Sequence, residues 1–400
     1  MLQKIQNIDI ENKRVFLRCD FNVPFDKNGI ITDYTRVNAV LKTIKYLLKN
    51  NCSIVISSHL GRPKDFEQNF SLAPVQRVLR ALLRLPIILA SGVSDEKTIE
   101  QAKKLKSGEI LLLENLRFDS REKKNDENFA KELASMGEIY INDAFGVSHR
   151  SHTSVDKITD YFLEGEKAAG FLLQKENKYF KDKINNPERP FIAIVGGAKV
   201  SSKLLTIKKL LEKVDKIIIG GAMAFTFLKA EGYEIGKSLV ENDLLEEAKN
   251  IIETAKKLNK ELILPVDFII SDKFGENGII KTVNFDKIPE NFMGLDIGAK
   301  SIKLFEKKSE SAKMIFWNGP MGAYEFDSFF EGSASIANIL ANSKGETFAG
   351  GGDSIAVINK MGLGQELSFI STGGGASLEL LEGKKLVGIE KLKIKKISKN

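Results

Sequence analysis

The chain has 400 residues, of which 42% are hydrophobic and 28% are charged, a composition typical of a globular protein with two domains. It contains no run of about 18 apolar residues and begins without the apolar stretch of a secretory signal, so we expect neither a membrane partner nor export. Only two cysteines are present, which excludes a disulfide framework and a cysteine-based zinc site and indicates a reducing compartment, the cytoplasm.

The net charge of +7 is distributed unevenly along the chain. Residues 390–400 hold five lysines and one glutamate, so five minus one gives +4 for this tail. A basic tail can contact nucleic acid, but a solvated terminus is the more common explanation, and we expect no nucleic acid partner. All eleven arginines and all three histidines lie in residues 1–189. Because the guanidinium fork binds carboxylates and phosphates, the first half is suited to a small multivalent anion.

The first half of the chain alternates short apolar runs with amphipathic stretches. Strands are predicted at 14–21, 53–59, 86–91, 109–115 and 138–145, with helices at 35–50 and 72–85. The segment 168–176 is predicted as a helix, and the polar segment 177–190 has the composition of a linker.

The second half repeats this alternation. Strands are predicted at 190–197, 216–223, 261–270, 314–320, 346–353 and 368–374. The segment 271–291 breaks the pattern and is predicted as a β excursion from this domain.

Continuous β-branched runs separated by helices indicate parallel sheets with helices on both faces. We therefore expect an α/β fold of two doubly wound, Rossmann-like parallel-sheet domains that face a cleft and are joined by a hinge helix. The N-terminal domain is expected to span 1–172 together with the tail 385–400, and the C-terminal domain 173–384.

Polar residues in the first half follow the predicted strands. In parallel α/β sheets, ligands bind beyond the carboxyl ends of the strands, so side chains scattered over about 130 positions are brought to one edge. A single polar residue in such a place is usually only a surface group, but a coincidence at so many strand ends favours a site. The residues in question are Asp20, Asn22, Ser57, Ser58, His59, Gly61, Arg62, Asn115, Arg117, Asn142, Asp143, His149 and Arg150, with Arg36 opening a helix.

The stretch NDAFGVSHRSH, residues 142–152, has three possible interpretations. His149 and His152 have a spacing that could bind zinc together with Asp143, although no further nitrogen or sulfur ligand is near and Arg150 disfavours a cation. The histidines could instead cap a helix or pack in the core. We prefer a site for an anion, formed by Arg150 with the arginines at 36, 62 and 117.

Glycine-rich turns follow three strands of the second half. The turn GGAKVSSK (196–203) is predicted to place Lys199 and Lys203 four residues apart at the start of a helix, as in a phosphate site. In GGGDS (350–354), the single carboxylate of Asp353 is suited to Mg²⁺, which takes few protein ligands when phosphate oxygens are present. TGGG (372–375) is the third turn. Each is weak by itself, because glycine after a strand often serves only to reverse the chain.

The stretch WNGPMGAYE (317–325) contains the only tryptophan. Asn318 and Glu325 could bond a ribose or a base edge, although a structural turn around a packed Trp317 explains the pattern about as well. None of the turns matches GxGxxG, which lowers the expectation of a nicotinamide dinucleotide. An anion site and a nucleotide site in one chain suggest phosphoryl transfer, which needs cations and exclusion of water more than a covalent nucleophile.

Across about residues 14 to 384 the chain carries, in order, the motifs RCDFNVP, SSHLGRPK, LLLENLRF, NDAFGVSHRSH, GGAKVSSKL, GGAMAFTF, FWNGPMGAYE, GGGDS and STGGGASLELLEGK. In order and spacing these resemble the phosphoglycerate kinase family. The resemblance implies reversible phosphoryl transfer in glycolysis and gluconeogenesis, between 1,3-bisphosphoglycerate and MgADP to give 3-phosphoglycerate and MgATP. It also implies direct in-line transfer after hinge closure, and we expect a monomer.

The same resemblance assigns roles by motif. It implies a 3-phosphoglycerate site in the N-terminal domain, formed by Asp20, Asn22, Arg36, His59, Arg62, Arg117 and Arg150. It implies a nucleotide site formed by Gly197, Ala198, Lys199, Lys203, Leu295, Asn318, Pro320, Glu325, Gly351, Gly352, Asp353 and Ser354, with Asp353 as the Mg²⁺ ligand. Catalytic roles are implied for Arg36, Lys199, Gly373 and Gly374.

Two alternatives from other classes stay open at this point. A nicotinamide dehydrogenase could be built on the same architecture, and NADH rather than ADP would then quench the fluorescence of Trp317. A nucleic-acid-binding protein could use the basic tail, and RNA binding would then depend on salt and on residues 390–400.

Overall fold

The computed structural model describes residues 1–394, which form two compact units. Unit 1 comprises Met1–Tyr179 and the segment that begins at Lys384, and unit 2 comprises Phe180–Gly383. The predicted domain boundary at residue 172 lies within helix α5 (Phe171–Asn177), shortly before this division. Three lysines of the predicted basic tail, at 395, 396 and 399, lie outside the described residues.

Unit 1 is built on a six-stranded sheet in which every pairing is parallel. The strand order is β3-β4-β2-β1-β5-β6. The strands are β1 (Arg14–Arg18), β2 (Ser53–Ser57), β3 (Ile88–Leu89), β4 (Ile110–Leu112), β5 (Ile139–Asn142) and β6 (Lys167–Ala169). Of the two central strands, β2 is buried along its length and β1 from Val15 onward, as expected for strands covered on both faces.

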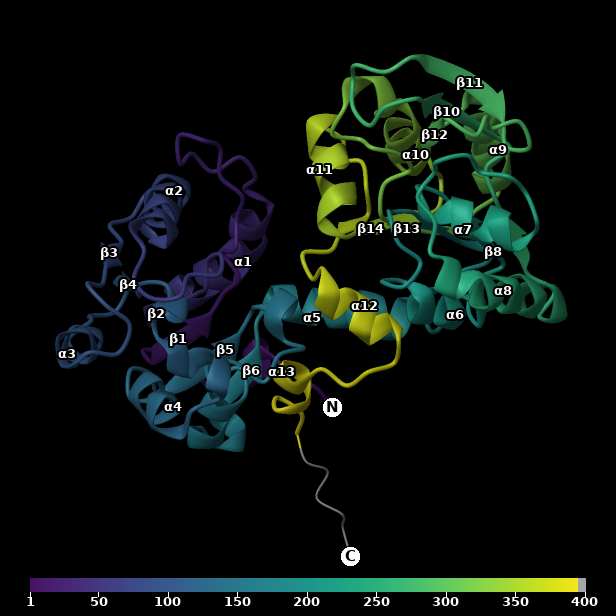
Figure 1. Cartoon of the computed structure of the whole chain (residues 1–400). Helices are drawn as coiled ribbons and strands as arrows, with labels where there is room; N and C mark the ends of the chain where they lie inside the picture. Colours follow the sequence, from purple (N-terminus) through teal and green to yellow (C-terminus); the bar gives the residue numbers. More distant parts are fainter. Residues whose placement is uncertain (395–400) are drawn as a thin grey trace, which may run out of the picture. The chain divides into compact units, whose positions relative to one another are not determined.

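Helices follow the strands of unit 1 and cover the sheet (Figure 1). They are α1 (Thr35–Lys49), α2 (Ala73–Leu83), α3 (Glu96–Lys103), α4 (Glu127–Ala134), α5 and α13 (Val387–Glu390). Short 3-10 segments lie at η1 (Ile5–Asn7), η2 (Gln68–Phe70), η3 (Leu116–Phe118), η4 (Ser120–Lys124), η5 (Phe145–Val147), η6 (Lys157–Tyr161) and η7 (Glu164–Glu166). Helix α1 illustrates why the helices pack on the sheet. Its residues Val37, Val40, Ile44 and Leu47 recur at helical spacing and are fully buried.

The predicted helix 168–176 is wrong at its start, because the chain first forms β6 beside β5. The helix begins only after Gly170, where buried side chains satisfy its first N–H groups. Phe171 donates its N–H to Thr43 Oγ1 and Leu173 donates to Asp143 Oδ1, each at 3.0 Å. A Cβ at Gly170 would lie 2.3 Å from the Asp143 carboxyl carbon, so this close approach requires glycine. Asp143 therefore caps helix α5.

Unit 2 contains a second six-stranded parallel sheet, with the order β15-β14-β13-β7-β8-β9. Its strands are β7 (Phe191–Val195), β8 (Lys216–Ile219), β9 (Glu261–Ile263), β13 (Met314–Asn318), β14 (Glu346–Gly350) and β15 (Phe369–Ile370). The expectation of an α/β fold with two parallel sheets is thus confirmed.

A small antiparallel sheet, β11-β10-β12, accompanies this parallel sheet (Figure 1). Its strands are β10 (Asp267–Ser271), β11 (Ile280–Asn284) and β12 (Met293–Ile297). The predicted single strand 261–270 is wrong: β9 ends at Ile263, and β10 belongs to the small sheet. Pro265 lies between them and lacks the N–H that a continuous strand needs. The predicted β excursion is confirmed by β11.

The helices of unit 2 are α6 (Leu204–Leu211), α7 (Met223–Ala230), α8 (Leu245–Lys257), α9 (Ala299–Ser309), α10 (Glu331–Ala341), α11 (Gly352–Lys360) and α12 (Gly375–Leu381). Short 3-10 segments lie at η9 (Asn242–Leu244) and η10 (Asp327–Phe329). Among residues 1–394, every helix is too short or too polar to cross a bilayer.

The first half of the predicted linker 177–190 is helical. Residues Lys178–Lys183 form a π-helix, η8, that continues directly from α5. Phe180 is 1% exposed and packs edge-on against the rings of Phe316 and Phe348 in unit 2. This segment was predicted as a linker because most of its residues are polar. A single buried aromatic residue does not produce the periodic apolar pattern that predicts a helix.

The segment from Lys384 to Ile394 returns to unit 1. The N–H of Gly388 donates to the carbonyl of Ser148, and the N–H of Gln3 donates to the carbonyl of Leu392. Lys391 forms ion pairs with Asp156 and Asp160 at 3.3 and 2.7 Å. The described part of the tail is therefore docked on unit 1.

Candidate functional site

In unit 1, the loops after β1, β2 and β4 are tied to one another by side chains. Asn22 Oδ1 accepts the N–H of Gly61 at 2.8 Å. Asn115 bonds both the N–H and the carbonyl of Leu60, and Arg117 donates to the carbonyl of Gly61. Residues that are up to 95 positions apart, from Asn22 to Arg117, thus form one edge beyond the carboxyl ends of the strands. The structure brings these predicted residues together as expected from the parallel sheet.

Arg36 and Asp20 form an ion pair at this edge. Burial opposes ionisation of Asp20, but the charge of Arg36 is the largest of the opposing effects and lowers the pKa of the carboxyl to about 2. His59 Nδ1 lies 3.7 Å from Asp20. Burial, aided by the charges of three nearby arginines, lowers the pKa of His59 well below its ordinary value. His59 is therefore neutral at pH 7, and it can donate or accept a hydrogen bond without adding charge.

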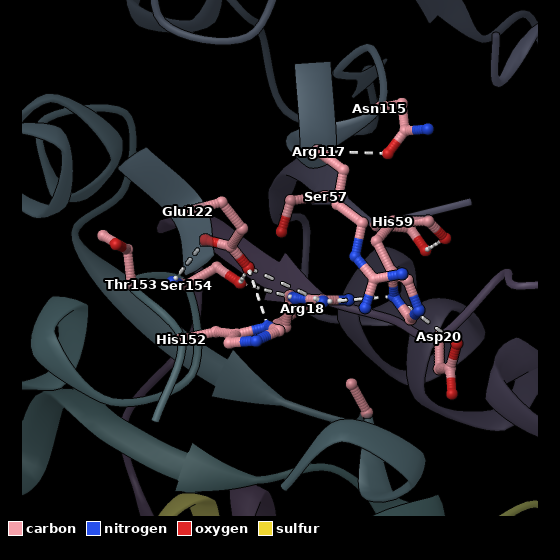
Figure 2. A network of polar contacts seen from close by, with 12 residues as sticks. Arg18, Asp20, Ser57, His59, Asn115, Arg117, Glu122, His152, Thr153 and Ser154 are labelled. Carbon is pink, nitrogen blue, oxygen red and sulfur yellow. Dashed lines mark hydrogen bonds and ion pairs between the residues drawn. The ribbon is translucent and has the colours of Figure 1, made fainter. Parts of the chain in front are cut away.

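Arg18 lies beside Asp20, His59 and Arg117 (Figure 2), and no motif in the sequence singled it out. Its side chain is fully buried, the last of strand β1. Its Nε donates to Ser154 Oγ at 2.8 Å, another nitrogen lies 3.4 Å from His59 Nδ1, and Glu122 Oε1 lies 4.0 Å away. A fully buried arginine needs such partners, because an unpaired charge is costly inside a protein.

The surroundings of His152, in the stretch 142–152, differ from those of a zinc ligand. His152 is 9% exposed, and its Nδ1 lies 3.9 Å from Glu122. Burial and the charge of Arg18 lower the pKa of His152 to about 4. Over residues 1–394 there is no group of three or more His, Cys, Asp or Glu side chains placed to hold a metal ion. The packed interpretation therefore describes His152, and anion binding by Arg150 stays a prediction.

Arg62 and Arg150 are exposed, in contrast to Arg36 and Arg117. Within the described residues, neither guanidinium makes an ion pair with a carboxylate. Arg117 is 7% exposed, and burial together with the charges of Arg18 and Arg150 lowers its pKa to about 10. Its Nε is buried and has no partner in residues 1–394. The edge thus offers guanidinium groups whose donors are not all satisfied, which is the requirement for an anion site.

In unit 2, a cavity of about 780 Å³ lies beyond the strand ends. Its lining is mostly apolar, with backbone glycines and a few polar groups, which suits the base and ribose of a nucleotide. Six predicted residues line it: Gly197, Ala198, Leu295, Pro320, Glu325 and Asp353. The motif comparison did not select Phe274, Asp296 and Tyr324, which line it as well.

Lys199 and Lys203 do not lie on a helix, contrary to the prediction. Helix α6 begins at Leu204, and both lysines belong to the turn before it. Lys203 turns inward, and its Nζ donates to the carbonyls of Gly196 and Asn318 at 2.6 and 2.9 Å. Burial lowers the pKa of Lys203 to about 8, against the opposing charge of Asp353. Lys199 is exposed.

The predicted contact of Asn318 with a ribose or base is not supported by its geometry. Asn318 is 3% exposed and is absent from the lining of the cavity. Its Nδ2 donates to the carbonyl of Gly350 at 2.9 Å, and Ser354 Oγ accepts the N–H of Gly319 at 2.6 Å. Both side chains therefore fix the glycine turns after β13 and β14. Sequence inspection cannot reveal this, because the partners are backbone atoms of other loops.

Asp353 lies in the first turn of α11 and accepts a hydrogen bond from the Tyr324 hydroxyl at 3.1 Å. Gly351, with φ +93°, turns the chain into this helix, and Gly352 begins it. Gly373 and Gly374 precede α12, where the Gly373 N–H donates to Ser371 Oγ. The predicted glycines thus all lie at turns after strands of the unit 2 sheet.

The family model described as Phosphoglycerate kinase matches residues 5–384. A phosphoglycerate kinase of Nautilia profundicola is 56% identical over 382 residues, covering 95% of this chain and 96% of that protein. One from Nitratiruptor sp. is 54% identical over 394 residues, covering 98% and 99%. A solved phosphoglycerate kinase structure from Coxiella burnetii has a TM-score of 0.85 at 38% identity, covering 98% of this chain and 99% of that one.

Proposed function

The chain belongs to the phosphoglycerate kinase family, and on that premise we propose how its own residues divide the work of the reaction. The reaction is the reversible transfer of a phosphoryl group between 1,3-bisphosphoglycerate and ADP, giving 3-phosphoglycerate and ATP, a step of glycolysis. Membership in this family favours the kinase reaction over the dehydrogenase alternative. The geometry of unit 1 carries the proposal, because its joined loops present several guanidinium groups at one edge.

Unit 1 is proposed to bind 3-phosphoglycerate. The ligand has a carboxylate and a phosphate, and the arginine fork is matched to both. Arg62 and Arg150, which have no carboxylate partner within residues 1–394, would meet the most highly charged part of the ligand. Asp20 and Asn22 would orient its hydroxyl group, and neutral His59 would add a hydrogen bond. Arg117 completes the proposed substrate set.

Unit 2 is proposed to bind ADP and ATP. The apolar cavity beside Leu295 and Pro320 would take the adenosine, and Glu325 would bond the ribose. Lys203, at the turn before α6, would contact the phosphates of the nucleotide, and exposed Lys199 would reach the transferred phosphoryl group. Arg36, Lys199, Gly373 and Gly374 are the proposed catalytic residues, since charge on the three oxygens of the moving group has to be neutralised. Direct in-line transfer after hinge closure stays a prediction.

Mg²⁺ is proposed to accompany the nucleotide. This ion needs near-octahedral oxygen ligands and usually keeps water and phosphate oxygens besides one or two carboxylates. Three carboxylates line the cavity: Asp296, Glu325 and Asp353. Asp296 already accepts the backbone N–H groups of Ile297 and Gly332, and Glu325 is proposed for the ribose. Asp353, which the Tyr324 hydroxyl orients, fits the requirement. When bound, the ion would neutralise charge on the nucleotide's phosphates. The residues of this chain orient the ligand around it.

We also propose that the enzyme is monomeric and cytoplasmic, without membrane or nucleic acid partners. Both cysteines, Cys19 and Cys52, are free and buried, as is usual in a reducing compartment. Sedimentation of the purified chain tests the monomer, since a stable dimer would sediment faster at every concentration above its dissociation constant.

A coupled assay tests the function. The chain is mixed with 3-phosphoglycerate, ATP and Mg²⁺, and a dehydrogenase that consumes the acyl phosphate reports turnover as loss of NADH. Turnover should require both substrates and the metal. Lys199→Ala tests the division of roles: turnover should fall by about two orders of magnitude or more. A folded Lys199→Ala variant with normal turnover would remove Lys199 from the mechanism.

A further inference from the structure

The segment 198–203 between β7 and α6 carries both lysines of the proposed nucleotide site, and it is neither helix nor strand (Figure 1). Ala198, Lys199, Ser201 and Ser202 are exposed, whereas Val200 is fully buried. A lysine on an exposed turn has a long flexible side chain and a mobile backbone unless another part of the protein fixes it. The structure contains such a fixing contact.

Glu241 holds this segment through Ser201. Its Oε2 accepts the backbone N–H of Ser201 at 3.0 Å, and its Oε1 accepts the Ser201 hydroxyl. The N–H of Val200 contributes a further hydrogen bond to the same carboxylate. One carboxylate thus binds consecutive backbone N–H groups and one hydroxyl, an arrangement that fixes the backbone on either side of Val200.

Glu241 is itself fixed from behind. Its N–H donates to Thr226 Oγ1 at 3.2 Å, and Thr226 is a buried residue of α7. Its carbonyl accepts the N–H of Leu244, the last residue of η9 and the one before α8 begins. Contacts therefore run from the body of unit 2 through Glu241 to the exposed turn.

The charge of Glu241 also fits this role. Burial raises the pKa of the Glu241 carboxyl. Hydrogen bonds from Ser201 and Val200 and the charge of Lys199 lower it, and the net effect is a lowered pKa. The group is therefore ionised throughout the neutral range, when its hydrogen bonds are charge-assisted and stronger than neutral ones.

We propose that Glu241 is a positioning residue for phosphoryl transfer, which holds the turn 198–203 so that Lys199 meets the transferred phosphoryl group. This inference rests on the proposed function, because it takes the role of Lys199 from there. Glu241 does not touch the substrates. Its effect arises because phosphoryl transfer depends on the placement of cations to within a fraction of an ångström.

Kinetics provide the first test. Glu241→Ala should lower kcat about tenfold, while the Kd for ADP changes less than about threefold because the adenosine cavity is untouched. Glu241→Gln keeps one acceptor oxygen and should fall between Glu241→Ala and the unchanged chain. The matched control is Glu247→Ala, which removes a carboxylate paired at 2.6 Å with Lys208 on the surface of the same unit. Its kcat should be unchanged within about twofold.

A double-mutant cycle separates this role from general support of the fold. Ser201→Ala alone should lower kcat less than Glu241→Ala, and the combined variant should be no slower than Glu241→Ala. Additive losses, or a fall in kcat that follows the thermal stability of the variants, would overturn the proposal.

Limited proteolysis adds a test that does not use activity. Trypsin cleaves after lysine, so release of the turn in Glu241→Ala should speed cleavage after Lys199 about tenfold, with cleavage elsewhere unaltered. Unchanged cleavage would show that Glu241 does not hold the turn, and would overturn the inference.

The two proposals can fail separately. If Lys199→Ala abolishes turnover but Glu241→Ala does not, the positioning role is wrong and the role of Lys199 stands. If Lys199→Ala retains turnover, the proposed role of Lys199 is wrong, and with it the reason for holding the turn.

Discussion

The two units place their proposed sites at the same position of the same kind of sheet, yet they form these sites by different means. Unit 1 uses side chains: Arg36 at the start of α1, and His59 and Arg117 after separate strands, are fixed by ion pairs and hydrogen bonds. Unit 2 uses backbone and empty space: glycine turns approach closely around a cavity of about 780 Å³.

This difference matches the ligands that are proposed for the two units. A small, highly charged acid offers little surface to bury, so its binding depends on placed charges. A nucleotide has a large apolar part, so its binding depends on the shape of a cavity. Removal of a side chain should therefore damage unit 1 most, and addition of a side chain should damage unit 2 most.

The largest expected effect is that of Arg36→Ala in unit 1. Turnover in the coupled assay should fall by about three orders of magnitude, because one cation that faces the moving phosphoryl group is lost. The Kd for ADP, measured by titration, should change by less than about threefold, since the nucleotide site is proposed in unit 2.

Arg77→Ala is the matched control, since Arg77 is an exposed residue of α2. It should leave turnover unchanged. Near-normal turnover of a folded Arg36→Ala variant would contradict the catalytic role, and loss of ADP binding would contradict the division between the units.

The second prediction adds one carbon to unit 2. A Cβ at Gly319 would lie 2.2 Å from Lys203 Nζ and 2.3 Å from the carbonyl oxygen of Gly196, at φ +98°. Gly319→Ala should therefore displace Lys203 and weaken ADP binding by about 30-fold or more. Because the backbone has a positive φ, the substitution should also lower the stability of the fold by roughly 1–3 kcal/mol.

Gly362→Ala separates strain from displacement. Its φ is +70°, and nothing lies within 4 Å of a Cβ there. It should destabilise the fold but leave the ADP Kd unchanged. Equal ADP affinities for the two variants would show that close packing at the turns is unimportant for the nucleotide.

The third prediction concerns pH, since all three histidines belong to unit 1. His152 has a pKa of about 4 in the folded protein, below its ordinary value of 6.5. The unfolded chain therefore binds the proton first, and folding stability falls as pH drops from about 6.5 to 4. The loss is on the order of 2 kcal/mol.

Urea unfolding at several pH values between about 4 and 7 measures this effect. His152→Asn should have a shallower dependence of the unfolding free energy on pH than the unchanged chain, whatever its stability at pH 7. Parallel curves would show that His152 does not titrate as its surroundings indicate.

The smallest expected effect is at the segment that returns to unit 1. Lys391→Ala removes the ion pairs to Asp156 and Asp160 and should cost about 0.5 kcal/mol, as half-exposed ion pairs do. Urea unfolding measures it beside Lys257→Ala, which removes an exposed pair within α8 of unit 2. A larger cost for Lys257→Ala would contradict a docked segment.

Most of the sheet architecture could be predicted, because apolar strands alternate with amphipathic helices at local spacing. The sequence did not reveal features set by distant partners. Strand β6 and the start of α5 depend on Asp143 and Thr43, and the division of 261–270 depends on the small sheet that β10 joins. Phe180 seemed part of a linker because its partners, Phe316 and Phe348, lie far along the chain.

The site residues show the same limit. Charged residues that stand after a strand could be selected, but Arg18 stands within one and was missed. Asn318 was selected for a ligand although its side chain bonds the carbonyl of Gly350. A motif gives the residue type and position, whereas the partner of a side chain is known only from the fold.

The return of residues Lys384–Ile394 to unit 1 has a consequence for the order of synthesis. Unit 1 is discontinuous, since the 204 residues of unit 2 separate its two parts. At the usual rate of translation, roughly 5–20 residues per second, the closing segment is made about 10–40 s after Tyr179. During that interval the nascent chain exposes the surface that α13 later covers. This surface includes the carbonyl of Ser148, which accepts the N–H of Gly388 in the complete fold. Unit 2 is contiguous and can complete its fold first, so the part of the chain that is made earliest is finished last.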